Sequence, residues 1–304
     1  MLYDIRLLIT YAFDSPTGGG RHLLRLLPAA VPGAQRLLRA EIEVRPAPRE
    51  QAEFSDFFGN RVVEVALPPG QDEISFSAIA RLERSVPVPG PDRSVSPCVL
   101  SREIATRLDL GPDSPHHFLG SSPRIRPSAA ITIYAAAAIE SAATLREATE
   151  AFGLALHRDM EFDPEATTVD TPPDEAFARR SGVCQDFAQI MIAGLRGLGI
   201  PAAYVSGFLR TVPPEGKPRL EGADAMHAWV RVWCGTEAGW VEYDPTNAMF
   251  AGSDHVTVAH GRDYGDVAPV AGVLRLAGAQ TSRQAVDVIV LAPKPAIQGQ
   301  PPAG

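Results

Sequence analysis

Cysteine and positive charge are both scarce in this chain, and each scarcity excludes a class of protein. The 304 residues include three cysteines, at positions 98, 184 and 234. Three thiols cannot form a disulfide framework or a four-cysteine zinc site. The formal net charge is −8, which argues against nucleic acid as a partner.

Long apolar runs are absent as well. The longest candidate, 129–143, is rich in alanine, is broken by Glu140 and falls short of the roughly 18 residues that a membrane span needs. The N-terminus, MLYDIRLLITYAF, lacks the basic and apolar regions of a signal peptide. We therefore expect a cytoplasmic protein with no membrane partner, whose thiols stay reduced.

What the chain does contain is typical of a folded protein with many turns. Apolar residues make up 45% and charged residues 21%, and there are 28 prolines. Short runs that alternate apolar and polar residues predict an N-terminal β-sandwich over residues 1–88. These runs are 3–7, 41–45, 61–67 and 73–79. A proline-punctuated linker is expected at 89–100.

The second half has a different pattern, which predicts a mixed helix and strand core over 101–292. One or two helices are expected within 129–158, a helix capped by Thr171, and an apolar helix at 184–198. Strands are expected at 202–209, 227–233, 240–244 and 285–291. The tail, 293–304, is rich in proline and glutamine, and we expect it to be flexible.

Cys184 stands at the first turn of the predicted apolar helix, directly after Gly182-Val183. A lone cysteine is usually a small buried hydrophobe. At a helix start, however, unpaired N–H groups and the positive end of the helix dipole favour a thiolate. Asp186 lies in the same turn, where an acid is favourable; we expect it to hold a neighbouring loop and give it no catalytic role.

His227 opens one predicted strand, and Asp244 ends the next. If Trp233 pairs with Trp240, Asp244 is diagonal to His227 on the same face, and a shift by two residues places it directly opposite. Either register lets the carboxylate reach the imidazole, whereas a slip by one residue does not. Alone, His227 is an ordinary strand-end histidine, and Asp244 before Pro245 is an ordinary turn residue.

Together, the three side chains form a chemical set. A thiol at a helix start, an imidazole at a strand end and a carboxylate on the next strand supply the nucleophile, base and orienting acid of acyl transfer. The Cys184 backbone N–H is a candidate oxyanion donor. The sequence does not reveal a second donor.

The motifs around these residues resemble the transglutaminase-like superfamily, and more narrowly the bacterial transglutaminase-like cysteine proteases with an N-terminal β domain. The resemblance rests on RSGVCQDFA, GLRGLGIPA and VSGF around and after Cys184, then HAWV at His227, WVEYDPT at Asp244 and GRDYGDVAP further on. The turn 56–60 and the segment 22–28 resemble the β domain of that group. The resemblance covers nearly the whole chain.

The resemblance implies an α+β fold, with an N-terminal β-sandwich followed by a papain-like core whose nucleophile helix packs on an antiparallel sheet. It also implies that Cys184 is the nucleophile, His227 the general base and acid, and Asp244 the orienting carboxylate. His260 stands just before the GRDYGDVAP motif, where a small or apolar residue is expected. We expect it to be a surface or loop residue.

Three functions remain open from the sequence. We favour hydrolysis of an amide or isopeptide bond of a peptide or protein through a Cys184 thioester. A lysine amine could resolve the same thioester, which would make the protein a crosslinking transglutaminase. A binding or scaffold protein without catalysis is the third interpretation. Neither the oligomeric state nor the role of the β domain can be predicted.

No cofactor or metal is expected. The pair His116-His117 lacks a third ligand nearby, so we interpret it as a loop rather than a zinc site. The run Gly18-Gly19-Gly20 is not followed by the lysine of a phosphate loop. No acidic loop has the spacing of a calcium site.

Overall fold

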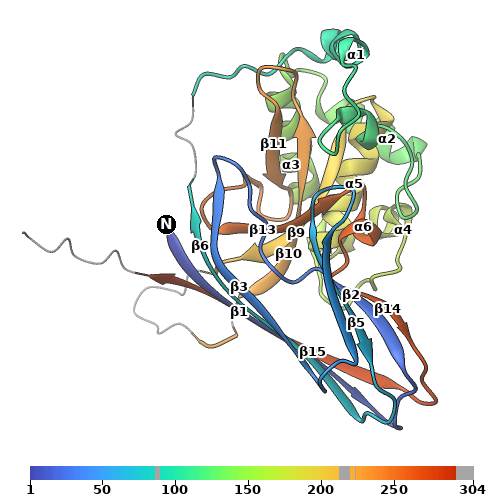
Figure 1. Cartoon of the computed structure of the whole chain (residues 1–304). Coiled ribbons are helices and arrows are strands. Elements are labelled where there is room, and N and C mark those ends of the chain that lie inside the picture. The colour runs from blue at the N-terminus through green and yellow to red at the C-terminus, as the bar shows by residue number, and fades with distance from the viewer. Residues whose placement is uncertain (86–89, 212–219, 223, 292–304) are drawn as a thin grey trace, which may run out of the picture.

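The computed structural model describes residues 1–85, 90–211, 220–222 and 224–291. The protein has an α+β fold, in which an N-terminal β-sandwich supports a layer of helices packed on an antiparallel sheet (Figure 1). The predicted fold class is therefore confirmed. Within the described residues, no helix combines the length and apolar character needed to cross a membrane.

The sandwich consists of two antiparallel four-stranded sheets. Alternate side chains of each long strand point between the sheets, as the period of two predicts. On the first strand, Tyr3, Ile5, Leu7 and Ile9 are all buried. One sheet has the order β15 (Gln280–Leu291), β1 (Leu2–Phe13), β6 (Glu73–Arg84), β3 (Gln35–Arg45), and the other β14 (Val270–Leu274), β2 (Gly20–Leu24), β5 (Arg61–Leu67), β4 (Glu50–Ser55).

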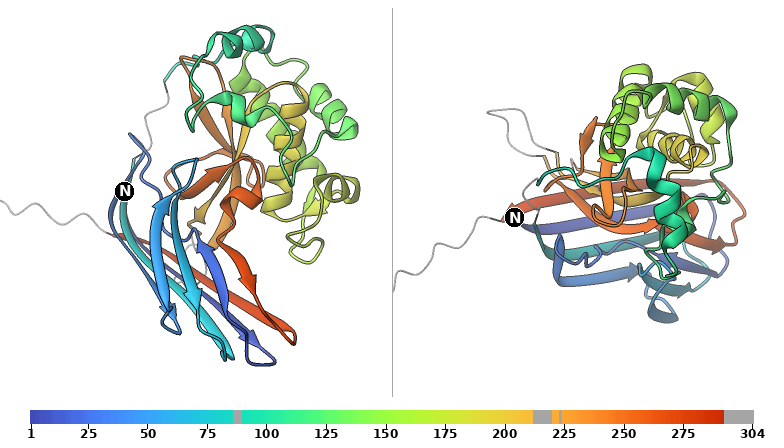
Figure 2. Two further views of the ribbon diagram at one scale, coloured as in Figure 1. Left: turned by 45° about the vertical axis from the view of Figure 1, so that its right-hand side comes forward. Right: turned by 90° about the horizontal axis from the view of Figure 1, so that it is seen from above.

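The last two strands correct the sequence analysis, which placed 285–291 in the catalytic core. β15 pairs with β1 along its whole length and β14 pairs with β2, so the chain returns to the sandwich (Figures 1 and 2). Alternation buries Val286 and Val288 against this sheet. Such alternation predicts a strand with one buried face but does not identify its partner strand, which explains the error.

The core sheet has five antiparallel strands, and its central strand and one neighbouring strand carry His227 and Asp244. Its order is β12 (Met249–Phe250), β11 (Trp240–Asp244), β10 (Ala225–Trp233), β9 (Ala202–Leu209), β13 (His255–Gly261). Helix α5 (Cys184–Gly197) packs on β9 and β10. Twelve of its residues are buried, which explains why the sequence is apolar nearly all round.

The remaining helices lie around α5, most of them near their predicted positions. They are α1 (Pro97–Thr106), the 3₁₀ turn η1 (Pro115–Phe118), α2 (Ala129–Ala138), α3 (Leu145–Asp159), α4 (Pro173–Arg179) and α6 (Tyr264–Val267). The pattern within 129–158 forms two helices, because Thr144 and Glu147 make a capping box that starts the second. The N-cap of α4 is Pro172, one residue after the predicted Thr171.

The expected linker at 89–100 is partly helical, because α1 begins at Pro97, a position that proline favours. Residues 86–89 lie outside the described residues, as does the expected tail, 293–304.

The sandwich and the core are joined at strand β13, an edge of the core sheet. Gln35 donates to the Thr257 carbonyl over 2.7 Å and accepts from the Thr257 N–H over 3.0 Å. Asn60 binds both backbone groups of His260 in the same way, over 2.8 and 2.9 Å. Two buried amide side chains thus satisfy an edge whose backbone groups would otherwise lack partners.

His260 lies in this joint, so the expectation of a surface or loop residue is wrong. Its side chain is 20% exposed. Burial, together with the charge of Arg231, lowers the pKa of His260 to about 4, although Asp113, Glu242 and Asp56 act in the opposite direction. Because the folded pKa is below the unfolded value, the neutral ring contributes stability at neutral pH that is lost as pH falls from about 6.5 toward 4.

Replacing His260 with phenylalanine is expected to reduce the acid sensitivity of folding. Between about pH 7 and 4.5, the wild type should lose roughly 2 kcal/mol more unfolding free energy than the variant. Urea unfolding at both pH values measures this difference. His157→Gln, at an exposed histidine, is the control. Equal acid sensitivity in wild type and H260F would contradict the assignment.

Candidate active site

Cys184 is the first residue of α5, and the backbone before it makes a sharp turn. Arg180 has a left-handed conformation, with φ of 56°, and the short strand β8 (Ser181–Gly182) then pairs in parallel with β7 (Glu161–Phe162). The Cys184 side chain is partly buried. Its position at the helix start is the predicted one.

Asp186 fixes this turn from within the helix. Its Oδ2 accepts hydrogen bonds from the Val183 N–H over 2.8 Å and from the Thr167 hydroxyl over 2.6 Å. A Cβ at position 182 would lie 2.6 Å from the same oxygen, so Gly182 leaves room for the carboxylate. The prediction that Asp186 holds a neighbouring loop is confirmed.

His227 and Asp244 are brought together by the register of β10 and β11. Trp233 pairs with Trp240, which confirms the first of the two registers considered. Nε2 of His227 lies 2.7 Å from Oδ2 of Asp244, and both side chains are buried. The Cys184 side chain also acts on the His227 ring and contributes to raising its pKa. Because Nε2 faces the carboxylate, Nδ1 is the ring nitrogen that remains available to exchange a proton with a substrate or a thiol.

The electrostatics of the pair favour an imidazolium. Burial opposes the charged form of His227, but the hydrogen bond to Asp244 and the interaction with Cys184 outweigh it and raise the pKa of His227. Burial likewise opposes the Asp244 carboxylate, but hydrogen bonds from His227 and His255 outweigh it, and the pKa of Asp244 is held well below its usual range. The carboxylate and the ring therefore stabilise each other's charged forms.

Asp244 is both a turn residue and the hydrogen-bond partner of His227, the two interpretations that the sequence left open. Its Oδ1 accepts from the N–H groups of Thr246 and Asn247 over 3.0 and 3.1 Å, which is the ordinary turn contact. Its Oδ2 faces His227 and also accepts from Nδ2 of Asn247 over 2.7 Å. The turn contacts therefore fix the carboxylate that orients the imidazole.

His255 is a member of the site that the sequence analysis missed. It starts β13 and is 1% exposed, and its Nε2 lies 3.1 Å from Oδ2 of Asp244. The Gly252 N–H donates to its Nδ1 over 3.2 Å, which places the ring proton on Nε2 as a donor to Asp244. No sequence spacing predicts this contact, because β13 and β11 are separated in the sheet by β9 and β10.

The same cluster has the spacing of a metal site. The ligand atoms of His227, Asp244 and His255 lie within 4.8 Å of one another. A metal would need a free lone pair on Nε2 of His255, but that nitrogen carries the proton given to Asp244. The donor set therefore fits a hydrogen-bonded cluster better than a metal site.

The adjacent histidines of the sequence do not belong to the site. In η1, Nε2 of His116 lies 3.0 Å from the carbonyl of Arg107, and Nε2 of His117 lies 3.0 Å from that of Leu110. Both rings thus hold the local backbone of this segment.

Replacing His255 with phenylalanine is expected to weaken the hydrogen-bond network around Asp244 while a ring of similar size still fills the space. Asp244 would lose one donor, so we expect the unfolding free energy to fall by about 1–3 kcal/mol. The alkylation rate of Cys184 by iodoacetamide should also fall, because a less firmly held carboxylate orients His227 less well. Mass spectrometry of the labelled peptide measures the rate.

His255→Gln tests whether the lost hydrogen bond is the cause. Its side-chain amide can still donate toward Asp244, so this variant should recover part of the alkylation rate. If His255→Phe and wild type label Cys184 equally fast, His255 does not position the carboxylate.

With this geometry established, comparisons with known proteins define the class. A model of the transglutaminase-like superfamily matches residues 133–245, and a model of the bacterial transglutaminase-like N-terminal region matches residues 3–83. A Mycobacterium tuberculosis protein is 32% identical over 254 residues, which is 79% of this chain and 77% of that protein. The chain belongs to the transglutaminase-like superfamily, with the bacterial N-terminal region, as the sequence motifs predicted.

Other relatives differ in how much of the chain they share. A Mycobacterium leprae protein is 29% identical over 286 residues, which is 93% of this chain and 96% of that protein. A protein-glutamine gamma-glutamyltransferase of Pseudomonas aeruginosa is 40% identical over 84 residues, which is 27% of this chain and 12% of that enzyme.

A crystal structure shares the whole architecture. The "putative cysteine protease" of Cytophaga hutchinsonii superimposes with a TM-score of 0.73 at 22% sequence identity, covering 96% of this chain and 91% of that one. At this identity the similarity establishes the fold alone.

Proposed function

We propose that the protein is a thiol enzyme that hydrolyses amide or isopeptide bonds of peptides or proteins. One observation carries the proposal: Nε2 of His227 lies 2.7 Å from a buried carboxylate oxygen of Asp244, and the Cys184 side chain helps to raise the pKa of the same ring. These residues have the chemistry and order of a nucleophile, a base and an orienting acid.

The proposed reaction has two halves. The Cys184 sulfur attacks the carbonyl carbon while the proton of the thiol resides on His227. As the tetrahedral intermediate collapses, the C–N bond breaks and His227 gives its proton to the leaving amine, which leaves a thioester. His227 then takes a proton from water, whose oxygen attacks the thioester, and returns that proton to the departing sulfur.

The start of α5 supports the charge that develops on the carbonyl oxygen. The Cys184 N–H makes no hydrogen bond within the described part of the chain, so it is free to donate to an oxyanion. Asp186 keeps this N–H in place by binding the preceding Val183 N–H. We assign the Cys184 N–H as the first oxyanion donor.

A hollow farther along α5 supports a peptide substrate. It has a volume of about 460 Å³ and lies between Gln189 of α5 and the segment that contains Asp170 and Thr171. Gln185, next to Cys184, holds this segment by donating to the Val169 carbonyl over 3.0 Å. The lining of the hollow includes Arg126 and Asp174, so it can bind both negatively and positively charged groups of a substrate.

Transfer to an amine is the second candidate. In that reaction a lysine amine, rather than water, attacks the thioester and forms an isopeptide bond. The relative named protein-glutamine gamma-glutamyltransferase, similar over 84 residues, favours this outcome. The two candidates share every step up to the thioester and differ only in the acceptor.

Ammonia release and peptide cleavage, measured side by side, distinguish the two candidates. The protein is incubated with a panel of glutamine-containing peptides, with and without a primary amine such as monodansylcadaverine. Peptide fragments that appear with and without the amine support hydrolysis of the peptide backbone. Ammonia release together with incorporation of the amine supports transfer. No product with any peptide, and equal alkylation of Cys184 and exposed Cys98, would favour the scaffold interpretation.

A further inference from the structure

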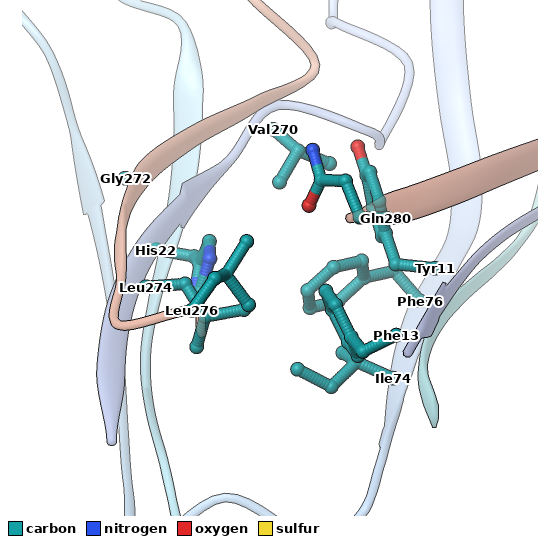
Figure 3. Close-up of a pocket in the computed structure, with 10 residues that line it drawn as sticks. All are labelled: Tyr11, Phe13, His22, Ile74, Phe76, Val270, Gly272, Leu274, Leu276 and Gln280. Atoms are coloured by element: carbon teal, nitrogen blue, oxygen red, sulfur yellow. The ribbon is translucent and has the colours of Figure 1, made fainter. Parts of the chain in front are cut away.

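A cavity of about 270 Å³ lies between the two sheets of the sandwich (Figure 3). Tyr11 and Phe76 line it from β1 and β6, whereas His22 and Leu274 line it from β2 and β14. In Figure 3 the amide of Gln280 lies between these two groups. The cavity belongs to the β domain and is separate from the site around Cys184.

His22 is the unusual residue of this cavity. It is 9% exposed, and neither nitrogen of its ring has a hydrogen-bond partner within the described part of the chain; its Nδ1 is fully buried. Burial lowers the pKa of His22, so the ring is neutral at pH 7 and offers one N–H donor and one lone pair. A buried polar group without a partner is costly unless something binds it.

Two glycines leave room for this imidazole. A Cβ at Gly272, the residue paired with His22 on β14, would lie 2.9 Å from Cδ2 of the ring. A Cβ at Gly20 would lie 3.2 Å from Cε1. Because neither glycine has a side chain, the His22 ring can lie against the wall of the cavity.

We propose that this cavity binds a small uncharged aromatic group that carries a hydroxyl, such as a phenol. The volume is just below the 300 Å³ or so of the smallest drug-sized pockets, which favours a single ring. With His22 neutral, none of the described lining residues is charged, which excludes an ionic ligand. The rings of Tyr11 and Phe76 suit an aromatic face, and His22 and Gln280 can bind the hydroxyl.

Fluorine NMR with 4-fluorophenol tests this proposal on the full chain. We expect saturable binding with a Kd on the order of 1 mM or tighter. 4-Fluorotoluene, which has the same ring without the hydroxyl, should bind at least roughly threefold more weakly, because it leaves His22 unpaired. 4-Fluorobenzoate should not bind. Equal affinity for the phenol and the toluene, or no saturable binding of the phenol, would overturn the proposal.

Two variants on the same side of the sandwich locate the binding. Leu276, 40% exposed at the rim of the cavity, is replaced with tryptophan to block it, and this should weaken 4-fluorophenol binding by at least about fivefold. Val273→Trp is the matched control, because Val273 is 75% exposed and does not line the cavity. Equal effects of the two variants would show that the phenol binds elsewhere.

His22→Leu tests the hydrogen bond of this ring and should reduce the preference for the phenol over the toluene. If this variant does not fold, the wild-type preference and the Leu276→Trp result still decide the proposal. The peptide acetyl-Gly-Tyr-Gly-amide then identifies the source of the hydroxyaromatic group. Displacement of 4-fluorophenol by this peptide indicates a tyrosine side chain, whereas binding of the phenol without displacement indicates a free small molecule.

Discussion

Replacing Cys184 with alanine is expected to abolish turnover, whichever acceptor resolves the thioester. Both proposed reactions form their covalent bond at this sulfur. Loss of a covalent nucleophile costs about 10³-fold to 10⁶-fold in kcat. The measurement is product formation on the best peptide of the glutamine panel.

The control for this variant is Cys98→Ala, which removes an exposed thiol. It should leave turnover unchanged. Circular dichroism of Cys184→Ala should match the wild type, because alanine is a good helix former at the start of α5. Turnover within tenfold of wild type in C184A would refute the proposed function.

Replacing Asp244 with asparagine is expected to have the second largest effect. The asparagine amide cannot accept from His227, His255 and Asn247 at once, and it removes the negative charge that stabilises the imidazolium. We expect kcat to fall by about 10³-fold to 10⁴-fold. The unfolding free energy should also fall by roughly 2–4 kcal/mol, because buried donors lose their acceptor.

The pH dependence of the unfolding free energy distinguishes the contribution of Asp244 from that of His227. The folded pKa of Asp244 is lowered, so its contribution is present above the unfolded pKa of about 4 and is lost as pH falls through the folded pKa. The folded pKa of His227 is raised, so its contribution is present below about pH 6.5 and is lost as pH rises through the folded pKa. Asp244→Asn should weaken both dependences.

Asp113→Asn is the control for Asp244→Asn, because it removes an acid whose side chain is 70% exposed. At pH 7 it should change neither kcat nor the unfolding free energy appreciably. A variant D244N with near-normal kcat and an unchanged pH profile would show that the carboxylate has a structural role only.

Local sequence patterns predicted much of the core. The strands at 202–209 and 240–244 are found at the expected residues, and α5 begins at Cys184 as expected. These elements have strong signals, namely apolar periodicity, β-branched runs and glycine or proline at the ends. The polar edge strand β4 was missed, because all six of its residues are exposed and show no alternation of burial.

The candidate site was predictable only in part. The sequence predicted the order of Cys184, His227 and Asp244. It also predicted the observed register of β10 and β11 as one of two, because the pairing of two strands in a hairpin follows from counting residues on each side of the turn. His255 was not accessible, since it reaches Asp244 from the far edge of the sheet. The cavity around His22 was also hidden, because its lining comes from both sheets and from both ends of the chain.

The amino-acid sequence by itself determined the local elements of this protein and the chemical types of its reactive side chains, because both depend on residues close together in the chain. Tertiary structure decided which strands pair at a distance, and thereby returned β14 and β15 to the sandwich. It also placed a second imidazole on Asp244 and an unpartnered one between two sheets. Such contacts depend on packing between distant segments, and no local pattern encodes them.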